Sequence, residues 1–235
     1  MTIPADDPNL TIYEDLEQGS DDWLQARCGI PTSTTISAML TPTGKIADNQ
    51  TSRTAVNNLA AERLTNRPPD PIWSRDIERG HLDEPLAREV YEQWKGVDVT
   101  EVGFMTRNIG GNVIGFSPDG LVNDEGLVEI KSRKPQLQLQ YVLTGDIPFA
   151  HFIQMQTGMF VSGRDWCDYC SYSGGLPMHI KRVHKDDTWH RRIIAALMAL
   201  EERAEEVQSD FDRLTKLMPA TEYVDHFGDD LEIIL

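Results

Sequence analysis

The chain has 235 residues, 40% of them apolar, and a formal net charge of −16 at pH 7. Its length and apolar content are enough for one large domain with a substantial core, and no apolar run reaches the roughly eighteen residues of a membrane span. The acidic balance excludes a surface coated with basic nucleic-acid-binding patches. It leaves room for a nucleic-acid enzyme, because basic residues can be concentrated in one channel, where the local field governs binding.

The N-terminus and the cysteines indicate the cellular compartment. Residues Met1–Asp7 lack the basic and apolar regions of a signal peptide. An odd number of cysteines, three, without a secretion signal indicates reduced thiols. We therefore expect a soluble protein of the cytoplasm that does not enter a membrane.

The N-terminal part of the chain predicts two short helices after a loose segment, residues 1–10. Ser20 is a suitable N-cap for the first helix, which carries Arg27 and ends at Gly29. The hydroxyl cluster Thr32, Ser33 and Thr34 is expected to cap a second helix that runs to about residue 40. A helix N-terminus and an adjacent arginine together suit a phosphate group. The alternative is an ordinary cap beside a surface arginine.

Two longer helices are expected next, over residues 51–65 and 77–94, with a break at residues 67–70. The second helix places one charge, Glu84, on an otherwise uncharged stripe. A carboxylate that points toward an apolar interior needs a cation, a metal or hydrogen-bond donors, since its burial is otherwise costly. The alternative is a capping or surface glutamate. The full stripe is Ile77, Gly80, Glu84, Ala87, Tyr91 and Trp94.

Strands are expected over residues 97–106 and 113–116, and they lead into the segment Ser117–Lys131. In this segment Asp119 lies in a Pro-Asp-Gly turn, and residues 123–126 have the composition of a hairpin turn. A hairpin would bring Asp119 beside Glu129. Because side chains on a strand alternate between its faces, Glu129 and Lys131 would point the same way.

Two carboxylates and a lysine on one sheet face form the pattern Asp…Glu-x-Lys. Mg²⁺ prefers oxygen ligands and typically binds one or two carboxylates together with substrate phosphate oxygens. The pattern therefore favours metal-dependent phosphodiester cleavage. The alternative is a common Asp-Gly turn followed by an ordinary edge strand, since short motifs have a high false-positive rate.

The C-terminal half predicts helices over 135–143 and 148–161, a hairpin with strands at 165–172 and 178–184, and a long helix over 187–217. Gln156 is a polar exception on the apolar face of the second helix, and a buried amide needs hydrogen-bond partners.

Cys167, Cys170, His179 and His184 superficially resemble a zinc set. The odd spacing of the two cysteines on a strand places them on opposite faces, so they cannot converge on one ion. We therefore do not expect zinc at this hairpin.

Taken together, four sequence blocks resemble the phage-type alkaline exonucleases, the lambda exonuclease type of the YqaJ-like viral recombinase family, within the PD-(D/E)xK nuclease superfamily. This resemblance spans about residues 16–185 and implies an α/β (α+β) fold with a central mixed β-sheet flanked by helices. We expect a single nuclease domain with its core at about 16–217 and tails at 1–10 and 219–235. The four blocks are Glu17–Ser33, Gly80–Ala87, Ser117–Gly120 with Glu129–Lys131, and Gln154-x-Gln156.

The resemblance also implies roles for individual residues. Asp119, Glu129 and the Ile130 carbonyl would bind catalytic Mg²⁺ or Mn²⁺, and Glu84 would hold a second metal or its water. Lys131 would position or deprotonate the attacking water, and Gln156 would orient the nucleophile or the scissile phosphate. The 5′-phosphate of the DNA end would be bound by the remaining set, which is Arg27, Thr32, Ser33, Thr34 and Ser117.

The implied activity is 5′→3′ digestion of one strand of linear duplex DNA from 5′-phosphorylated ends, which leaves a 3′ single strand for annealing. Family members form ring-shaped homotrimers and work beside a single-strand annealing protein, here in the cytoplasm of a bacterial host. Residues 67–75 and the Cys167–Cys170 hairpin depart from the family pattern. The alternatives are an endonuclease or single-strand nuclease of the same superfamily, and an inactive DNA-end-binding scaffold.

Overall fold

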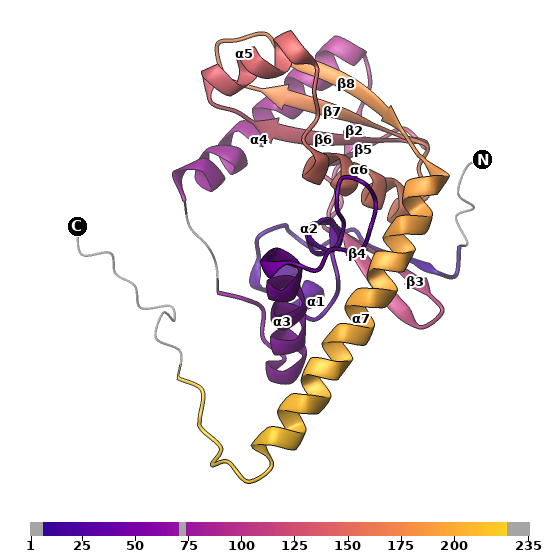
Figure 1. Ribbon diagram of the computed structural model, residues 1–235. Coiled ribbons are helices and arrows are strands. Elements are labelled where there is room, and N and C mark those ends of the chain that lie inside the picture. The colour runs from indigo at the N-terminus through magenta and orange to yellow at the C-terminus, as the bar shows by residue number, and fades with distance from the viewer. Residues whose placement is uncertain (1–6, 71–73, 225–235) are drawn as a thin grey trace, which may run out of the picture.

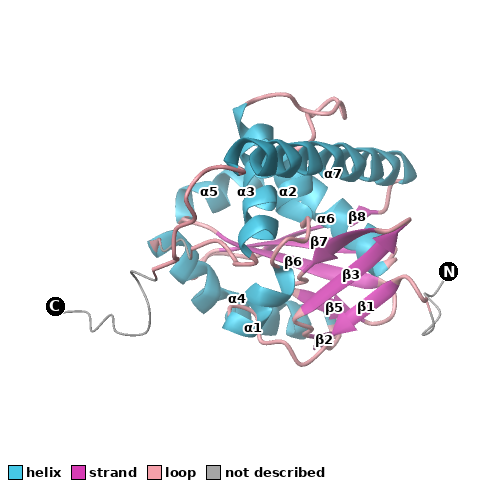
Figure 2. Cartoon of the chain, turned by 90° about the horizontal axis from the view of Figure 1, so that it is seen from below, coloured by secondary structure: helices cyan, strands magenta, loops and turns pink. Residues whose placement is uncertain are grey.

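The computed structural model describes residues 7–70 and 74–224. It contains two β-sheets flanked by helices, so the predicted mixed α/β fold is confirmed (Figures 1 and 2). The larger sheet has five strands in the order β2-β5-β6-β7-β8. Only the central β6–β7 pair is parallel, and the other pairs are antiparallel, which makes the sheet mixed. The strands are β2 (Val99–Thr100), β5 (Gly120–Val122), β6 (Gly126–Ser132), β7 (Trp166–Tyr172) and β8 (His179–His184).

The β5–β6 hairpin forms as its turn chemistry predicts. Asn123 adopts a positive φ of 47° in the turn, a conformation that asparagine tolerates better than most residues. The Arg164 guanidinium donates hydrogen bonds to the carbonyls of Val122, Asn123 and Gly126 and so fixes the turn from outside. The register pairs Gly120 with Val128. The hairpin therefore has a defined register, which determines what lies beside Asp119.

The two faces of the larger sheet pack against different helices. Val128 and Ile130 pack with Ala87 and Tyr91 of α4 (Arg75–Lys95). Leu127, which points the opposite way, belongs to the main core with residues of α6 (Phe149–Ser162) and α7 (Asp187–Thr215). Helix α7 begins after the Asp186 N-cap and extends well beyond the sheet alongside α3 (Gln50–Thr65) (Figure 1).

Cys167 and Cys170 also separate between these faces. Cys167 lies in the main core, and Cys170 lies in the cluster under α4. Both thiols are buried and free. The prediction that the two cysteines point in opposite directions is confirmed.

The smaller sheet has the order β1-β3-β4 and is antiparallel throughout. Its strands are β1 (Leu10–Tyr13), β3 (Phe104–Ile109) and β4 (Asn112–Phe116). The single strand expected over 97–106 is wrong, because the chain crosses here from one sheet to the other: Val99 pairs with Val122, whereas Phe104 pairs with Tyr13. A Cβ atom at Gly103 would lie 1.9 Å from the Leu16 carbonyl oxygen, so the crossing requires a glycine.

The expectation that residues 1–10 are loose is also wrong for the part that is described. Asp7 accepts a hydrogen bond from Arg107 at 2.7 Å, and Leu10 begins β1. Residues 1–6, 71–73 and 225–235 lie outside the described chain, including most of the expected C-terminal tail and part of the 67–75 loop.

The remaining helices are close to their predicted positions. They are α1 (Asp21–Arg27), α2 (Ser33–Ala38) and α5 (Pro135–Thr144). Ser20 caps α1 by accepting the Trp23 N–H, and Gly145 ends α5 in the left-handed conformation. Across the described residues, no helix combines the length and apolar character needed to cross a membrane.

Candidate functional site

The segment before β5 and the middle of β6 meet at Asp119. Its Oδ2 accepts a hydrogen bond from the Ile130 backbone N–H at 2.6 Å. The hairpin register, with Gly120 opposite Val128, places Asp119 beside Glu129. The predicted convergence of these two carboxylates is therefore confirmed.

Glu129 and Lys131 point to the same side of β6. The Lys131 Nζ lies 2.5 Å from the Glu129 Oε1, and Glu129 is only 4% exposed. Burial opposes a charge on Lys131, but the nearby Glu129 and Asp119 carboxylates outweigh it and raise the lysine pKa. Lys131 thus carries a firmly held proton at neutral pH.

The pKa of Asp119 is raised to about 8. Burial is the largest cause, and the negative charges of Glu129 and Glu84 add to it, while Lys131 and the Ile130 N–H oppose it. Closely spaced carboxylates of this kind are destabilising unless a cation or a proton joins them. The site therefore has excess negative charge that a divalent cation would relieve.

Glu84 approaches from α4 and is held by Arg88. The Arg88 Nη2 lies 2.7 Å from Glu84, and its Nη1 lies 2.6 Å from Glu101. Its Nε donates to the Asp119 backbone carbonyl at 3.2 Å. One arginine therefore links Glu84 to the chain at Asp119. Burial raises the pKa of Glu84, against the opposing charges of Arg88 and Lys131.

The stripe predicted around Glu84 is buried only in its middle. Ala87 and Tyr91 are buried, whereas Ile77 and Trp94 are 42% and 60% exposed. The two ends of α4 thus extend past the sheet, and the prediction that the whole stripe faces an apolar interior is wrong at Ile77 and Trp94.

The donor set fits a hard divalent cation. Asp119 and Glu129 supply two carboxylates, in line with the one or two that Mg²⁺ commonly uses. Among the described residues, no three His, Cys, Asp or Glu side chains converge as a ready-made cluster. Backbone, water or substrate oxygens would have to complete the coordination of a metal at this site.

Arg27 contacts the segment that leads into Asp119. Its Nη1 donates to the Ser117 hydroxyl at 2.8 Å, and its guanidinium lies 4.0 Å from the centre of the Trp23 ring. Trp23 in turn donates to the Gly103 carbonyl at 2.9 Å. Burial lowers the pKa of Arg27 to about 10, although Glu62 opposes the shift. Arg27 therefore stays charged and is fixed in place. Its hydrogen-bond partner, Ser117, lies two residues before Asp119 in the chain.

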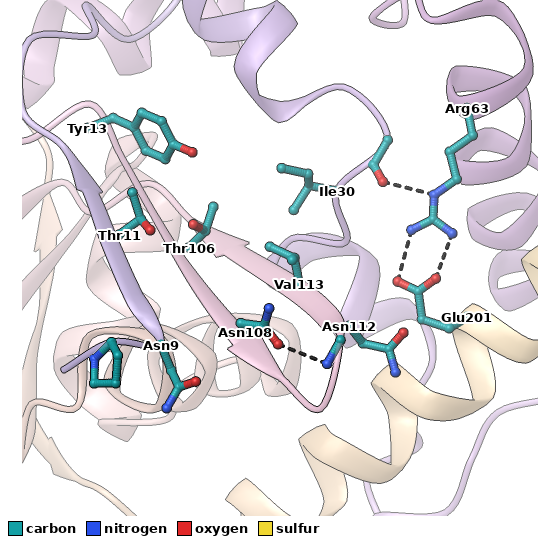
Figure 3. Close-up of a pocket in the computed structure, with 13 residues that line it drawn as sticks. Asn9, Thr11, Tyr13, Ile30, Arg63, Thr106, Asn108, Asn112, Val113 and Glu201 are labelled. Carbon is teal, nitrogen blue, oxygen red and sulfur yellow. Dashed lines mark hydrogen bonds and ion pairs between the residues drawn. The ribbon is translucent and has the colours of Figure 1, made fainter.

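A second arginine fixes the end of α1. The Arg63 Nε donates to the Gly29 carbonyl at 3.0 Å, and its two terminal nitrogens bond both Glu201 oxygens at 2.6 and 2.9 Å (Figure 3). This bidentate pair joins α3 to α7. It also holds Gly29, which follows the α1 helix that carries Arg27, so long-range contacts determine the position of Arg27.

The three hydroxyl residues expected at the phosphate site have different surroundings. Thr32 and Thr35 form a capping box at the start of α2. Ser33 is the first residue of that helix. Thr34 accepts a hydrogen bond from the Gln154 side chain at 3.3 Å.

Comparisons with known proteins identify the family of this chain. The model of the YqaJ-like viral recombinase domain matches residues 22–165, more than half of the chain. The chain belongs to the YqaJ-like viral recombinase family. Among curated proteins, no sequence matches it.

Solved structures support the assignment of this YqaJ-family chain. The alkaline exonuclease LHK-Exo from Laribacter hongkongensis is 31% identical, with a TM-score of 0.70, and the match covers 83% of this chain and 100% of that one. LHK-Exo in complex with dAMP gives 30% identity and a TM-score of 0.74, covering 84% and 98%. A phage-related exonuclease from Haemophilus somnus 129PT is similar in fold alone, at 14% identity, 77% and 96% coverage and a TM-score of 0.57.

Gln156 of this YqaJ-family chain does not point its amide at the carboxylates. Its Nε2 donates to the His184 carbonyl at 2.9 Å, and its Oε1 accepts the Asp186 N–H at 3.0 Å. Both ends of the side chain thus tie α6 to the junction of β8 and α7. The role predicted for Gln156 in orienting a nucleophile has no support in this arrangement.

Gln154, two residues earlier, has an amide group that is only partly engaged. It faces Thr34, and its Oε1 is buried without a hydrogen-bond partner among the described residues. The sequence block contains both glutamines, but the sequence pattern pointed to Gln156 because that residue lies on the apolar stripe of the helix. An unpaired buried amide oxygen is uncommon and indicates a site that a ligand or water completes.

Proposed function

We propose that this chain is a phage-type, metal-dependent exodeoxyribonuclease. It would digest one strand of linear duplex DNA 5′→3′ from 5′-phosphorylated ends and leave 3′ single-stranded overhangs for annealing. The observation that carries the proposal is the meeting of Asp119, Glu129 and Lys131 on one side of the β5–β6 hairpin. Membership of the YqaJ-like family and the likeness to the alkaline exonuclease LHK-Exo support it.

Mg²⁺ or Mn²⁺ is the proposed cofactor. Asp119, Glu129 and the Ile130 carbonyl would hold it, and Glu84 would hold a second ion or its water. A divalent cation bound here would stabilise negative charge on the oxygens of the reacting phosphate. The raised pKa of Asp119 supports this assignment, because burial and the neighbouring carboxylates disfavour its negative charge, which a bound cation would offset.

Lys131 would act as a cation. Its raised pKa makes it a poor base at neutral pH, so of the two roles implied by the resemblance we favour positioning the water and stabilising negative charge. Gln154, with its free amide oxygen, replaces Gln156 in our proposal as the residue that orients the water or the scissile phosphate.

Arg27 and Ser117 form the proposed pocket for the 5′-phosphate. The guanidinium has neutral hydrogen-bond and ring partners, Ser117 and Trp23, which leaves its charge available for an anion. Thr34 would contribute through its contact with Gln154, and Thr32 and Ser33 would shape the start of α2. A charge-assisted bond to a terminal phosphate would favour phosphorylated over hydroxyl ends.

A homotrimeric ring, a single-strand annealing partner and a location in the cytoplasm of a bacterial host are parts of the same proposal and rest on the family. The assignment of the whole chain to one nuclease domain is also part of the proposal and rests on the family. A ring would reconcile the net charge of −16 with DNA binding, because basic residues would line the passage while the exterior stays acidic.

The proposal is tested with linear and circular duplexes of the same sequence. With Mg²⁺, we expect mononucleotides to be released from the 5′-phosphorylated strand of the linear DNA, while the complementary strand and the circle stay intact. EDTA should stop the reaction. Cutting of the circle would instead identify an endonuclease, and binding without cutting would identify a scaffold.

A further inference from the structure

Arg133 lies on the same side of β6 as Glu129 and Lys131. Arg133 directly follows the strand and continues its pairing, since its backbone N–H donates to the Tyr172 carbonyl at 2.7 Å. Because side chains alternate along a strand, residues 129, 131 and 133 share one side. Arg133 therefore lies two residues, about 6.6 Å along an extended chain, beyond Lys131.

The Arg133 guanidinium is held by neutral groups. Its Nη2 lies 2.7 Å from the Tyr169 hydroxyl and 3.1 Å from the His151 Nδ1. The guanidinium also lies 4.9 Å from the centre of the Tyr141 ring. An arginine cannot accept a hydrogen bond, so the Nδ1 of His151 must carry no proton in this contact. Burial, together with the charges of Lys131 and Arg133, lowers the pKa of His151 to about 3 and keeps the ring neutral.

The charge of Arg133 is consequently uncompensated. In the part of the chain that the structure describes, no carboxylate forms an ion pair with it. Its Nε is buried and has no hydrogen-bond partner within those same residues. Arg182 shows the usual arrangement for comparison, because two of its nitrogens, Nε and Nη2, each bond the buried Asp168 at 2.8 Å. Partly buried charges normally have an opposite charge nearby, so Arg133 lacks an anion.

The position of Arg133 indicates which anion it would bind. Asp119 precedes β5, on one side of β6, and Ser117, the hydrogen-bond partner of Arg27, lies two residues before it. Tyr169 belongs to β7, on the other side of β6, where it pairs with Glu129. A DNA strand whose 5′-phosphate lies at Arg27 and whose cleaved linkage lies at the carboxylates would next pass Arg133.

We propose that Arg133, oriented by His151 and Tyr169, binds a phosphate on the 3′ side of the cleaved linkage in the strand that is digested. The inference rests on the proposed function and adds a contact for the strand that remains after each cut. The outer terminal nitrogen of the guanidinium has no hydrogen-bond partner among the described residues, because His151 and Tyr169 both contact Nη2, so it is free to donate a charge-assisted hydrogen bond to a phosphate oxygen.

The test combines a protein variant with a modified substrate. Binding of a 5′-phosphorylated duplex is measured by fluorescence anisotropy without divalent cation, over a salt series. We expect Arg133→Gln to weaken binding roughly tenfold and to reduce the slope of log K against log salt by about one. A neutral methylphosphonate at the matching 3′ phosphate should weaken binding by the wild-type protein and have no further effect on Arg133→Gln.

Arg213→Gln is the matched control. Arg213 pairs with Asp210 near the end of α7 and its side chain is 68% exposed, so we expect an unchanged salt slope and an unchanged penalty at every methylphosphonate position. Thermal unfolding checks that each variant is folded. If Arg133→Gln does not fold, Arg133→Lys is used instead. Because its ammonium keeps the charge but loses the orientation given by His151 and Tyr169, it should keep the salt slope and show a smaller position-specific penalty than wild type.

The outcomes separate the two proposals. A wild-type protein that binds and digests the duplex, with no methylphosphonate position coupled to Arg133, would overturn the role of Arg133 alone. A wild-type protein that neither binds nor digests the duplex would overturn the proposed function, and the Arg133 contact with it.

Discussion

The Asp119 carboxylate accepts the Ile130 backbone N–H at 2.6 Å, which fixes it beside Glu129 on the neighbouring strand. A single hydrogen bond does not offset burial and two nearby negative charges, so the pKa of Asp119 rises to about 8. The geometry that would bind a metal is thus unfavourable without one. The unfavourable charge on Asp119 in the metal-free protein has measurable consequences for metal binding and for stability.

Metal affinity should depend on pH. Binding requires a deprotonated Asp119, so below its pKa of about 8 affinity should rise about tenfold for each pH unit. It should level off above that pH. Calorimetric titration of Mn²⁺ between pH 6.5 and 9 measures this without any nuclease assay. An affinity that stays constant across the series would show that Asp119 carries no proton to displace.

The same residue should reduce the stability of the metal-free protein at alkaline pH. Because the folded-state pKa is raised above the unfolded value, the folded protein binds more protons, and stability falls as pH rises from about 4 toward 8. Asp119→Asn should therefore raise the melting temperature in EDTA at pH 9 and have little effect at pH 4. Each kcal/mol gained corresponds to roughly 2–4 °C.

A control for this stability effect is Asp98→Asn, at an exposed position, which should leave the melting temperature unchanged at both pH values. An Asp119→Asn protein that melts lower than wild type at pH 9 would contradict the assignment of excess negative charge to this site.

Substitutions of the two glutamines of α6 should have separate effects, one on stability and the other on activity. Gln156→Ala leaves the His184 carbonyl and the Asp186 N–H without their partner, and we expect it to cost about 1–3 kcal/mol of unfolding free energy. Gln154→Ala should lower the rate of DNA digestion and leave stability nearly unchanged, since it donates only one long hydrogen bond, to Thr34. Denaturant unfolding and single-turnover digestion measure the two effects. The reverse pattern would restore the active role to Gln156.

Arg27 should determine the preference for phosphorylated ends. Arg27→Ala is expected to reduce digestion of 5′-phosphorylated duplex by roughly 10- to 100-fold, the scale of a lost charge-assisted contact. Digestion of the 5′-hydroxyl duplex should change little. The ratio of kcat/KM for the two substrates is the measurement. An equal loss on both would assign Arg27 to packing against Trp23 and Ser117.

Local patterns predicted the carboxylate pair because the information is local. The turn residues 123–126 and the two-residue alternation in β6 fix the register of the hairpin, and the register places Asp119 beside Glu129. Glu84 was likewise found as a charge on a helical stripe, although its partner Arg88 lies one turn away and was not identified.

The features that were missed depend on distant contacts. The change of sheet near Gly103 depends on a distant contact, because it is the approach of Leu16 that requires the glycine. Gln154 and Gln156 are two residues apart on one helix, and periodicity cannot say which amide is taken up by distant backbone groups. The role proposed for Arg133 depends on its contacts with His151 of α6 and Tyr169 of β7.

The most direct test of the account is mononucleotide release from a 5′-phosphorylated linear duplex by the wild-type protein and by Lys131→Ala. Lys131 is partly exposed beside Glu129, so the variant should fold. With Mg²⁺, we predict rapid release by wild type and a loss of at least 100-fold in the variant, the scale seen when one transition-state charge donor is removed. Equal rates for the two proteins would contradict the assignment of cleavage to the site formed by Asp119, Glu129 and Lys131.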